Sequence, residues 1–187
     1  DNITLAIFRD VNQENSITTI INSAVGKQEY NGLDWSDSDK FYLFSFNFSD
    51  TKGLNIYING STILSSDDVL NVTGSTLNIG AIVNEDRTML ENFWYGYIDE
   101  IRLWNTILTD STIKFQSEHP DKLGDNYRYT DGNGNEISTY LDSLIGIWRL
   151  NFEEPLTIIE DDSEHDNDGN IYTLSGFSVE LSEKGAK

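Results

Sequence analysis

An acidic segment near the C-terminal end carries the side chains best suited to chemistry. Residues 153–168 contain eight carboxylates and neither lysine nor arginine. Calcium binds about six to eight hard oxygen atoms on a turning loop, and the run "DDSEHDNDGN" offers such groups around Gly169. The composition therefore predicts a calcium site, with expected ligands Asp162, Asp166, Asp168 and Asn170. The alternative is a solvated acidic turn that holds no ion.

The same segment begins like an EF-hand loop but does not complete one. Glu164, Asp166 and Asp168 alternate before Gly169, as the first ligands of an EF-hand do. The twelfth position, where an EF-hand needs a glutamate, is Ser175. No flanking helices are expected either, so the hypothesis that remains is a site within the loop alone.

A second oxygen-rich run, "TDGNGNEIS", occupies residues 130–138. Its Asp131, Asn133 and Asn135 alternate like the first ligands of a calcium loop. Glu136, however, stands where such a loop needs a glycine. We interpret this run as the tip of a hairpin rather than as an ion site.

The adjacent acids Asp99 and Glu100 interrupt an apolar run and are the strongest catalytic candidates. Retaining glycosidases need two carboxylates that converge on one cleft, and neighbouring strand residues point to opposite faces. A structural role is therefore favoured, in which one acid pairs with Arg102 or accepts from loop amides. The motifs of serine hydrolases, zinc proteases and phosphate-binding loops are absent as well. We predict that the chain is not an enzyme.

Aromatic side chains that could stack on sugar rings form another class of candidate. Trp35 lies in the polar turn "GLDWSDSD", and Trp94 and Tyr95 precede the acidic pair. These three are our candidate ligand-binding residues. The alternative is that these three cover the rim of the core, while Trp104 and Trp148 lie in the core itself.

Nearly all the elements that must position these residues are predicted to be strands. Segments in which apolar and polar residues alternate are separated by turn-forming residues, which is typical of an antiparallel sandwich or barrel. Asn59-Gly60 predicts a two-residue hairpin turn. One helix, residues 108–119, is expected to be capped by Thr109 or Asp110 and stopped by Pro120. The expected strands are residues 2–8, 16–25, 41–48, 53–60, 75–83, 143–152, 170–174 and 177–181, with a return strand after the hairpin.

Four stretches together span about half of the chain: "KFYLFSFNFSDTKGLNIYINGSTI", "STLNIGAI", "GYIDEIRLWNTILTDSTI" and "GIWRLNFEEPLTIIEDDSEHDNDGNIYTL". They resemble the laminin-G-like, concanavalin A-like lectin superfamily in its bacterial and pentraxin-related branch, and the third stretch is the most specific. The resemblance implies an all-β fold, a two-sheet antiparallel jelly-roll sandwich with one short helix. The family's Asp-Ser and Asn-Asp-Gly pattern would fall on Asp162, Ser163, Asn167, Asp168 and Gly169.

The order of these stretches departs from the family, in which the tryptophan-containing fourth segment usually opens the domain. Residues 143–187 either close the same sandwich or begin a following repeat. We favour closure, because "GFSVEL" continues as a strand. The expectation is one domain over residues 1–187, cut from a longer chain because it begins with Asp1.

Charge and composition limit the classes of molecule that this chain is expected to bind. A net charge of −20 disfavours binding to nucleic acid and to anionic membranes. No apolar run is long enough for membrane insertion. The absence of cysteine excludes disulfides and zinc–thiolate sites. The resemblance then implies a non-catalytic binding module of a larger extracellular, cell-surface or virion-surface protein. Its partner would be a glycan or another surface ligand, with calcium as cofactor. The alternative is an architectural module that contacts neighbouring proteins in a virion, such as a phage, or in a surface layer.

Overall fold

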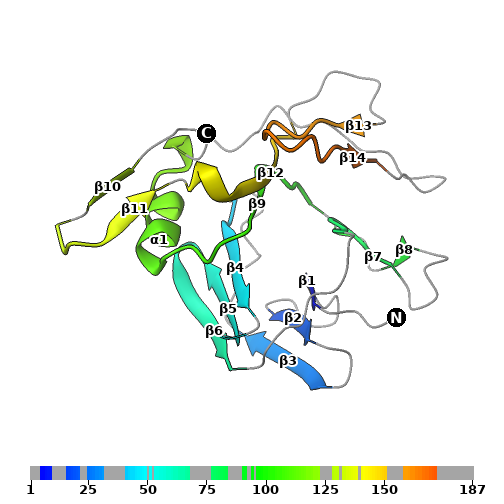
Figure 1. Ribbon diagram of the computed structural model, residues 1–187. Helices are drawn as coiled ribbons and strands as arrows, with labels where there is room; N and C mark the ends of the chain where they lie inside the picture. The colour runs from blue at the N-terminus through cyan, green and yellow to red at the C-terminus, as the bar shows by residue number, and fades with distance from the viewer. Residues whose placement is uncertain are drawn as a thin grey trace. The chain divides into compact units, whose positions relative to one another are not determined.

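The computed structural model forms two compact units, Asp1–Gly96 and Tyr97–Lys187, which are described separately. Figure 1 labels the strands and the α-helix. Among the described residues, no helix is long and apolar enough to cross a membrane. The structure describes residues 5–9, 16–21, 25–31, 41–49, 51, 53–67, 77–83, 90–91, 94, 96–122, 128–130, 132–138, 140–150 and 158–171.

The first unit opens with an antiparallel sheet of β1 (Leu5–Arg9), β2 (Ser16–Ile21) and β3 (Val25–Asn31), in that order. The sequence predicted β1 and β2, but it extended the second strand to Val25. The structure instead ends β2 at Ile21 and begins a separate strand at Val25. β3 escaped prediction because "VGKQEYN" is polar and has no alternation of apolar residues.

A second antiparallel sheet joins β4 (Phe44–Ser49), β5 (Gly53–Ile58) and β6 (Ser61–Ser66). All but one of the β5 residues are buried, so this central strand is covered on both faces. Among the described residues, Leu54, Ile56 and Leu64 form a buried hydrophobic cluster, and Phe48 and Ile63 pack against it. Cross-strand pairs of this kind are the main source of stability in a sheet.

The hairpin between β5 and β6 turns at Asn59-Gly60, as predicted. Both residues have positive φ, 47° and 74°, the conformation that the tight turn requires. Asn59 also lengthens the β4–β5 ladder: its main-chain nitrogen donates to Leu43 O at 2.9 Å, and its side-chain Oδ1 accepts from Leu43 N at 2.9 Å. The asparagine side chain thus supplies the acceptor that a strand carbonyl would otherwise provide.

The expected strand at residues 75–83 is mostly wrong. Within the described residues only β7 (Ile82–Val83) is a strand, and it pairs with β8 (Leu90–Glu91). Gly80 has a φ of 80° and bends the chain, and its carbonyl accepts a 2.7 Å hydrogen bond from Trp94 N. A left-handed glycine inside an alternating pattern ended the strand that the apolar residues alone predicted.

The second unit is organised around β9 (Ile101–Trp104) and β12 (Leu144–Trp148), an antiparallel pair far apart in sequence. Ile147 lies opposite Arg102, and Trp148 lies opposite Ile101. The other elements of this unit are α1 (Asp110–Glu118), η1 (Pro120–Lys122), β10 (Arg128–Thr130), β11 (Glu136–Ser138), η2 (Leu141–Ser143), β13 (Ile158–Ile159) and β14 (Gly169–Asn170).

Helix α1 begins and ends where its capping residues predict. Thr109 is the N-cap, and its hydroxyl accepts from Thr112 N at 3.2 Å. Pro120 follows one residue after the C-cap. Thr112, Ile113 and Gln116 form the buried face, which explains how a largely polar helix stays attached to its unit.

The described part of the chain is mainly β, antiparallel throughout, with one α-helix. This agrees with the expected fold class. Closure into a two-sheet jelly roll stays a prediction. The predicted strands at residues 170–174 and 177–181 lie mostly or wholly outside the described residues.

Candidate functional site

The acidic segment covers one edge of β12 rather than standing free in solvent. β9 pairs with the opposite edge of that strand. On the covered edge, Ile147 N donates to Asp161 Oδ1 at 2.8 Å, Ile147 O accepts from Asp162 N at 2.9 Å, and Ile145 O accepts from Asn167 Nδ2 at 2.7 Å. Residues 161–167, here named the edge loop, therefore satisfy the groups that a third strand would otherwise bind.

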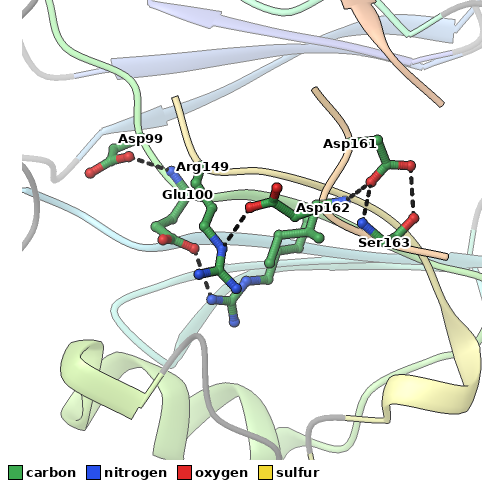
Figure 2. Close-up of polar contacts among 8 residues, drawn as sticks. Asp99, Glu100, Arg149, Asp161, Asp162 and Ser163 are labelled. Carbon is green, nitrogen blue, oxygen red and sulfur yellow. Dashed lines mark hydrogen bonds and ion pairs between the residues drawn. The ribbon is translucent and has the colours of Figure 1, made fainter. Parts of the chain in front are cut away.

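The Asp161 carboxylate holds the edge loop together. Oδ1 accepts from Ile147 N and from Ser163 N at 2.8 and 2.9 Å. Oδ2 accepts from Ser163 Oγ and from Asn167 N at 2.7 and 2.9 Å. The residue is only 7% exposed, and Figure 2 shows its carboxylate turned toward Ser163. Four donors on a buried carboxylate make a strong, charge-assisted arrangement.

Burial and hydrogen bonding shift the pKa of Asp161 in opposite directions, and the hydrogen bonds together have the larger effect. Burial alone would raise its pKa, but the bonds from Ile147, Ser163 and Asn167 outweigh burial, and the pKa falls below the ordinary value of 3.8. Asp161 is therefore a carboxylate at neutral pH, as four N–H and O–H donors require.

Two of the expected calcium ligands are bonded to other protein groups, and the other two are exposed. Asp162 forms an ion pair with Arg149, Oδ2 to Nε 3.1 Å (Figure 2), and Asp168 Oδ1 accepts from Asp161 N at 3.0 Å. Asp166 is exposed in a left-handed conformation, φ 51°, and Asn170 is exposed on β14. Among the described residues, no three acidic or histidine side chains are grouped so that they could hold an ion. Calcium binding by these residues stays a prediction.

Asp161 belongs to the acidic run but is not among the four expected ligands, although the sequence contains a signal for its role. The family pattern was aligned on Asp162, whereas the aspartate that bonds Ser163 is Asp161. An aspartate two residues before a serine can form a local side-chain-to-main-chain turn. That spacing would have pointed to Asp161 as the residue that organises the loop.

Trp148 reinforces the loop from β12. Its indole Nε1 donates to Asn167 O at 3.0 Å. The ring lies over Gly146, where an added Cβ would come within 2.9 Å of Trp148 Cζ2 and Cζ3. The sequence placed Trp148 in the core, whereas the structure makes it half-buried, with a hydrogen bond to the edge loop.

Asp99 and Glu100 have the structural role that the sequence favoured. Glu100 has a φ of 51°, so the chain bends at the acidic pair. Asp99 Oδ1 accepts from Glu100 N at 2.9 Å. The Glu100 carboxylate pairs with Arg102, Oε2 to Nη2 2.9 Å, and the Arg102 side chain is only 6% exposed. Strand β9 begins immediately after this bend, and the described residues from Gly96 to Glu100 form no strand.

The remaining candidates are only partly described. Trp94 is half-buried, and a Cβ added at Gly96 would come within 3.0 Å of its indole Nε1. The side chains of Trp35 and Tyr95 lie outside the described residues, as does Asp131. The run at residues 130–138 is indeed a hairpin, in which β10 pairs with β11, and Asn133 and Asn135 are exposed at its tip.

Comparison with known proteins places these features in a family. Searches of curated proteins and of solved structures found no significant match. A family model, described as the concanavalin A-like lectin/glucanases superfamily, matches residues 2–114. The match includes the β4–β6 hairpins, the acidic bend and β9, and it extends into α1. Because it covers more than half of the 187 residues, the chain belongs to the concanavalin A-like lectin/glucanases superfamily.

Proposed function

We propose that the chain is a non-catalytic binding module that recognises a glycan or another surface ligand. The observation that carries this proposal is membership of a superfamily described by its lectins and glucanases. Between those two classes, binding is better supported. The Asp99 and Glu100 carboxylates are bonded within their own segment, whereas glycoside hydrolysis needs two carboxylates on either side of a scissile bond.

The chemistry of the ligand follows from charge and aromatic content. A net charge of −20 repels polyanions such as sulfated polysaccharides. Neutral sugars offer C–H faces for stacking on aromatic rings. Trp35, Trp94 and Tyr95 are the proposed contacts, and Trp94 is supported by its partial exposure. In this proposal the module belongs to a larger extracellular, cell-surface or virion-surface protein.

Binding to a panel of neutral oligosaccharides tests the proposal. Replacing Trp94 with alanine should weaken the Kd about tenfold, as expected for an aromatic contact of about 1.5 kcal/mol. Phe41→Ala, at an exposed aromatic outside the candidate set, is the matched control and should leave the Kd unchanged. A panel that shows no binding at high protein concentration would refute glycan recognition.

Calcium dependence rests on the composition of the acidic segment alone. Asp161 already receives four hydrogen bonds, and Asp162 pairs with Arg149. Among the expected ligands, Asp166, Asp168 and Asn170 are exposed and offer oxygen atoms that an ion can reach. An ion held there would strengthen a loop that the protein has already shaped.

An architectural role is the second candidate, and exposed apolar side chains favour it. Leu77 and Ile79 of the first unit are 56% and 45% exposed. Exposed apolar residues gathered in one segment are typical of a protein contact. Light scattering over a range of concentrations tests this role. Self-association that Leu77→Ser and Ile79→Ser abolish would support it, and a strictly monomeric chain would argue for glycan binding.

A further inference from the structure

The sequence contains four Asn-x-Ser/Thr triplets, which begin at Asn2, Asn47, Asn59 and Asn71. This triplet is the acceptor of N-linked glycans in chains that pass through a glycosylating compartment. The structure describes the triplets of Asn47 and Asn59, whereas those of Asn2 and Asn71 lie outside the described residues. The two described triplets offer the same chemistry, but the fold places their asparagines in opposite surroundings.

Asn47 is buried within the sheet of the first unit. It belongs to β4 and is only 7% exposed. In the ladder it lies opposite Asn55 of the central strand β5, whose Oδ1 accepts from Ser65 Oγ of β6 at 2.8 Å. An N-linked glycan is bulky and must extend into solvent. The folded chain therefore has no room for a glycan on Asn47.

Asn59 is exposed at the two-residue turn between β5 and β6, and Ser61, which completes its triplet, is exposed as well. The contact with Leu43 also fixes the orientation of the Asn59 amide. Leu43 N is a donor, so the side-chain atom that it meets at 2.9 Å is the acceptor Oδ1. The nitrogen Nδ2, which would carry the sugar, is on the other arm of the planar amide.

A glycan on Asn59 leaves the bonds of the turn in place. The new bond replaces one hydrogen of Nδ2 and does not alter Oδ1, so the hydrogen bond from Leu43 N persists. The bond from Asn59 N to Leu43 O, 2.9 Å, involves only the main chain. The fold thus tolerates at Asn59 the modification that it excludes at Asn47.

We propose that Asn59 is an N-glycosylation site and that the folded chain carries no glycan at Asn47. This inference rests on the proposed extracellular or surface location, which takes the chain past the glycosylating enzyme. Asn59 Nδ2 attacks the anomeric carbon of an oligosaccharide that is bound to a polyprenyl diphosphate. A C–N bond forms, the C–O bond to the diphosphate breaks, Nδ2 gives up one proton, and polyprenyl diphosphate leaves.

Secretion of the whole chain from cultured animal cells, behind a cleavable signal peptide, tests the proposal and supplies the compartment directly. Enzymatic release of N-glycans in heavy-oxygen water converts each glycosylated asparagine into labelled aspartate, which peptide mass mapping locates. We expect label at Asn59 and none at Asn47. Ser61→Ala, at an exposed position, should abolish the label at Asn59 and shift the melting temperature by less than about 2 °C.

Ser49→Ala is the matched control, because it removes the triplet of Asn47 instead. It should leave the label at Asn59 unchanged. The proposal is overturned if the wild type is unlabelled at Asn59, if the folded chain is labelled at Asn47, or if Ser61→Ala keeps the label. A chain that is retained in the cells is mapped in the same way and decided by the same outcomes. Glycan recognition is tested separately by the oligosaccharide panel, so either proposal can fail without the other.

Discussion

Asp161 Oδ1 accepts a hydrogen bond from the main-chain nitrogen of Ile147, fourteen residues earlier in the chain, at 2.8 Å. A side chain here takes the place of a strand carbonyl, and Asp162 N completes the pairing by donating to Ile147 O. The acidic segment that suggested an ion site in the sequence is thus part of the sheet's own hydrogen bonding. The stability of this segment should depend on Asp161 more than on any other of its carboxylates.

Replacing Asp161 with asparagine should destabilise the fold by about 2–4 kcal/mol, because a neutral amide cannot accept four hydrogen bonds and buried donors lose their partners. Chemical denaturation measures the change in unfolding free energy. Asp166→Asn, at an exposed position, should cost less than about 0.5 kcal/mol. Equal losses for the two variants would show that Asp161 has no special role.

The contribution of Asp161 should vanish in acid. Its pKa is lowered in the folded chain, so the folded state favours the charged form. The stability it adds is therefore fully present above the ordinary pKa of 3.8 and is lost as pH falls through the lower folded pKa. Unfolding free energies of the wild type and Asp161→Asn should differ by a constant amount near neutral pH and converge below about pH 4. A difference that changes mainly between neutral and alkaline pH would point to another group.

Calcium should not substitute for Asp161. Because the carboxylate is bonded to protein donors, the loss caused by Asp161→Asn should be the same in excess calcium and in EDTA, within about 0.5 kcal/mol. Any calcium bound by Asp166, Asp168 or Asn170 would raise both melting temperatures in parallel. A wild type that unfolds when EDTA is added would instead show that an ion shapes the loop.

Loss of the edge loop's bonds should make β12 prone to strand addition. Its sequence, "LIGIW", is apolar and strand-forming, and an uncovered edge of this kind associates with other chains. Asp161→Ala combined with Asn167→Ala removes the partners of Ile147 N and Ile145 O. We expect oligomers in light scattering, favoured by high salt that screens the net charge of −20.

The control for this association is Asp162→Ala, which removes the ion pair with Arg149 but keeps the main-chain bond to Ile147. It should remain monomeric under the same conditions. A folded double variant that also stays monomeric would mean that the β12 edge needs no cover.

Local signals predicted the features that depend on local chemistry. Asn59-Gly60 and the Thr109 cap were confirmed because positive φ and capping are properties of a few adjacent residues. Gly80 ended an expected strand, since its left-handed conformation is not visible in apolar alternation. Strand β3 was missed because sheet pairing, not apolar content, stabilises it.

The site was harder to predict because it depends on distant pairing. Asp161 and Asp162 are identical neighbours, and only the register against β12 decides that the first is buried while the second meets Arg149. The link from Asn167 to Ile145 spans 22 residues. Composition revealed that the segment was unusual, but not which of its carboxylates the fold uses.

Gly146→Ala should disturb the edge loop through Trp148. The new methyl group would overlap the indole ring, which lies within 2.9 Å of the Cβ position, and moving the ring would break its bond to Asn167 O. We expect a loss of about 1–3 kcal/mol, typical of overpacking, and a shifted tryptophan fluorescence. In the Trp148→Phe background, where the smaller ring makes no such bond, the same substitution should cost less. If Gly146→Ala lowers the unfolding free energy equally in both backgrounds, the position of Trp148 does not depend on Gly146.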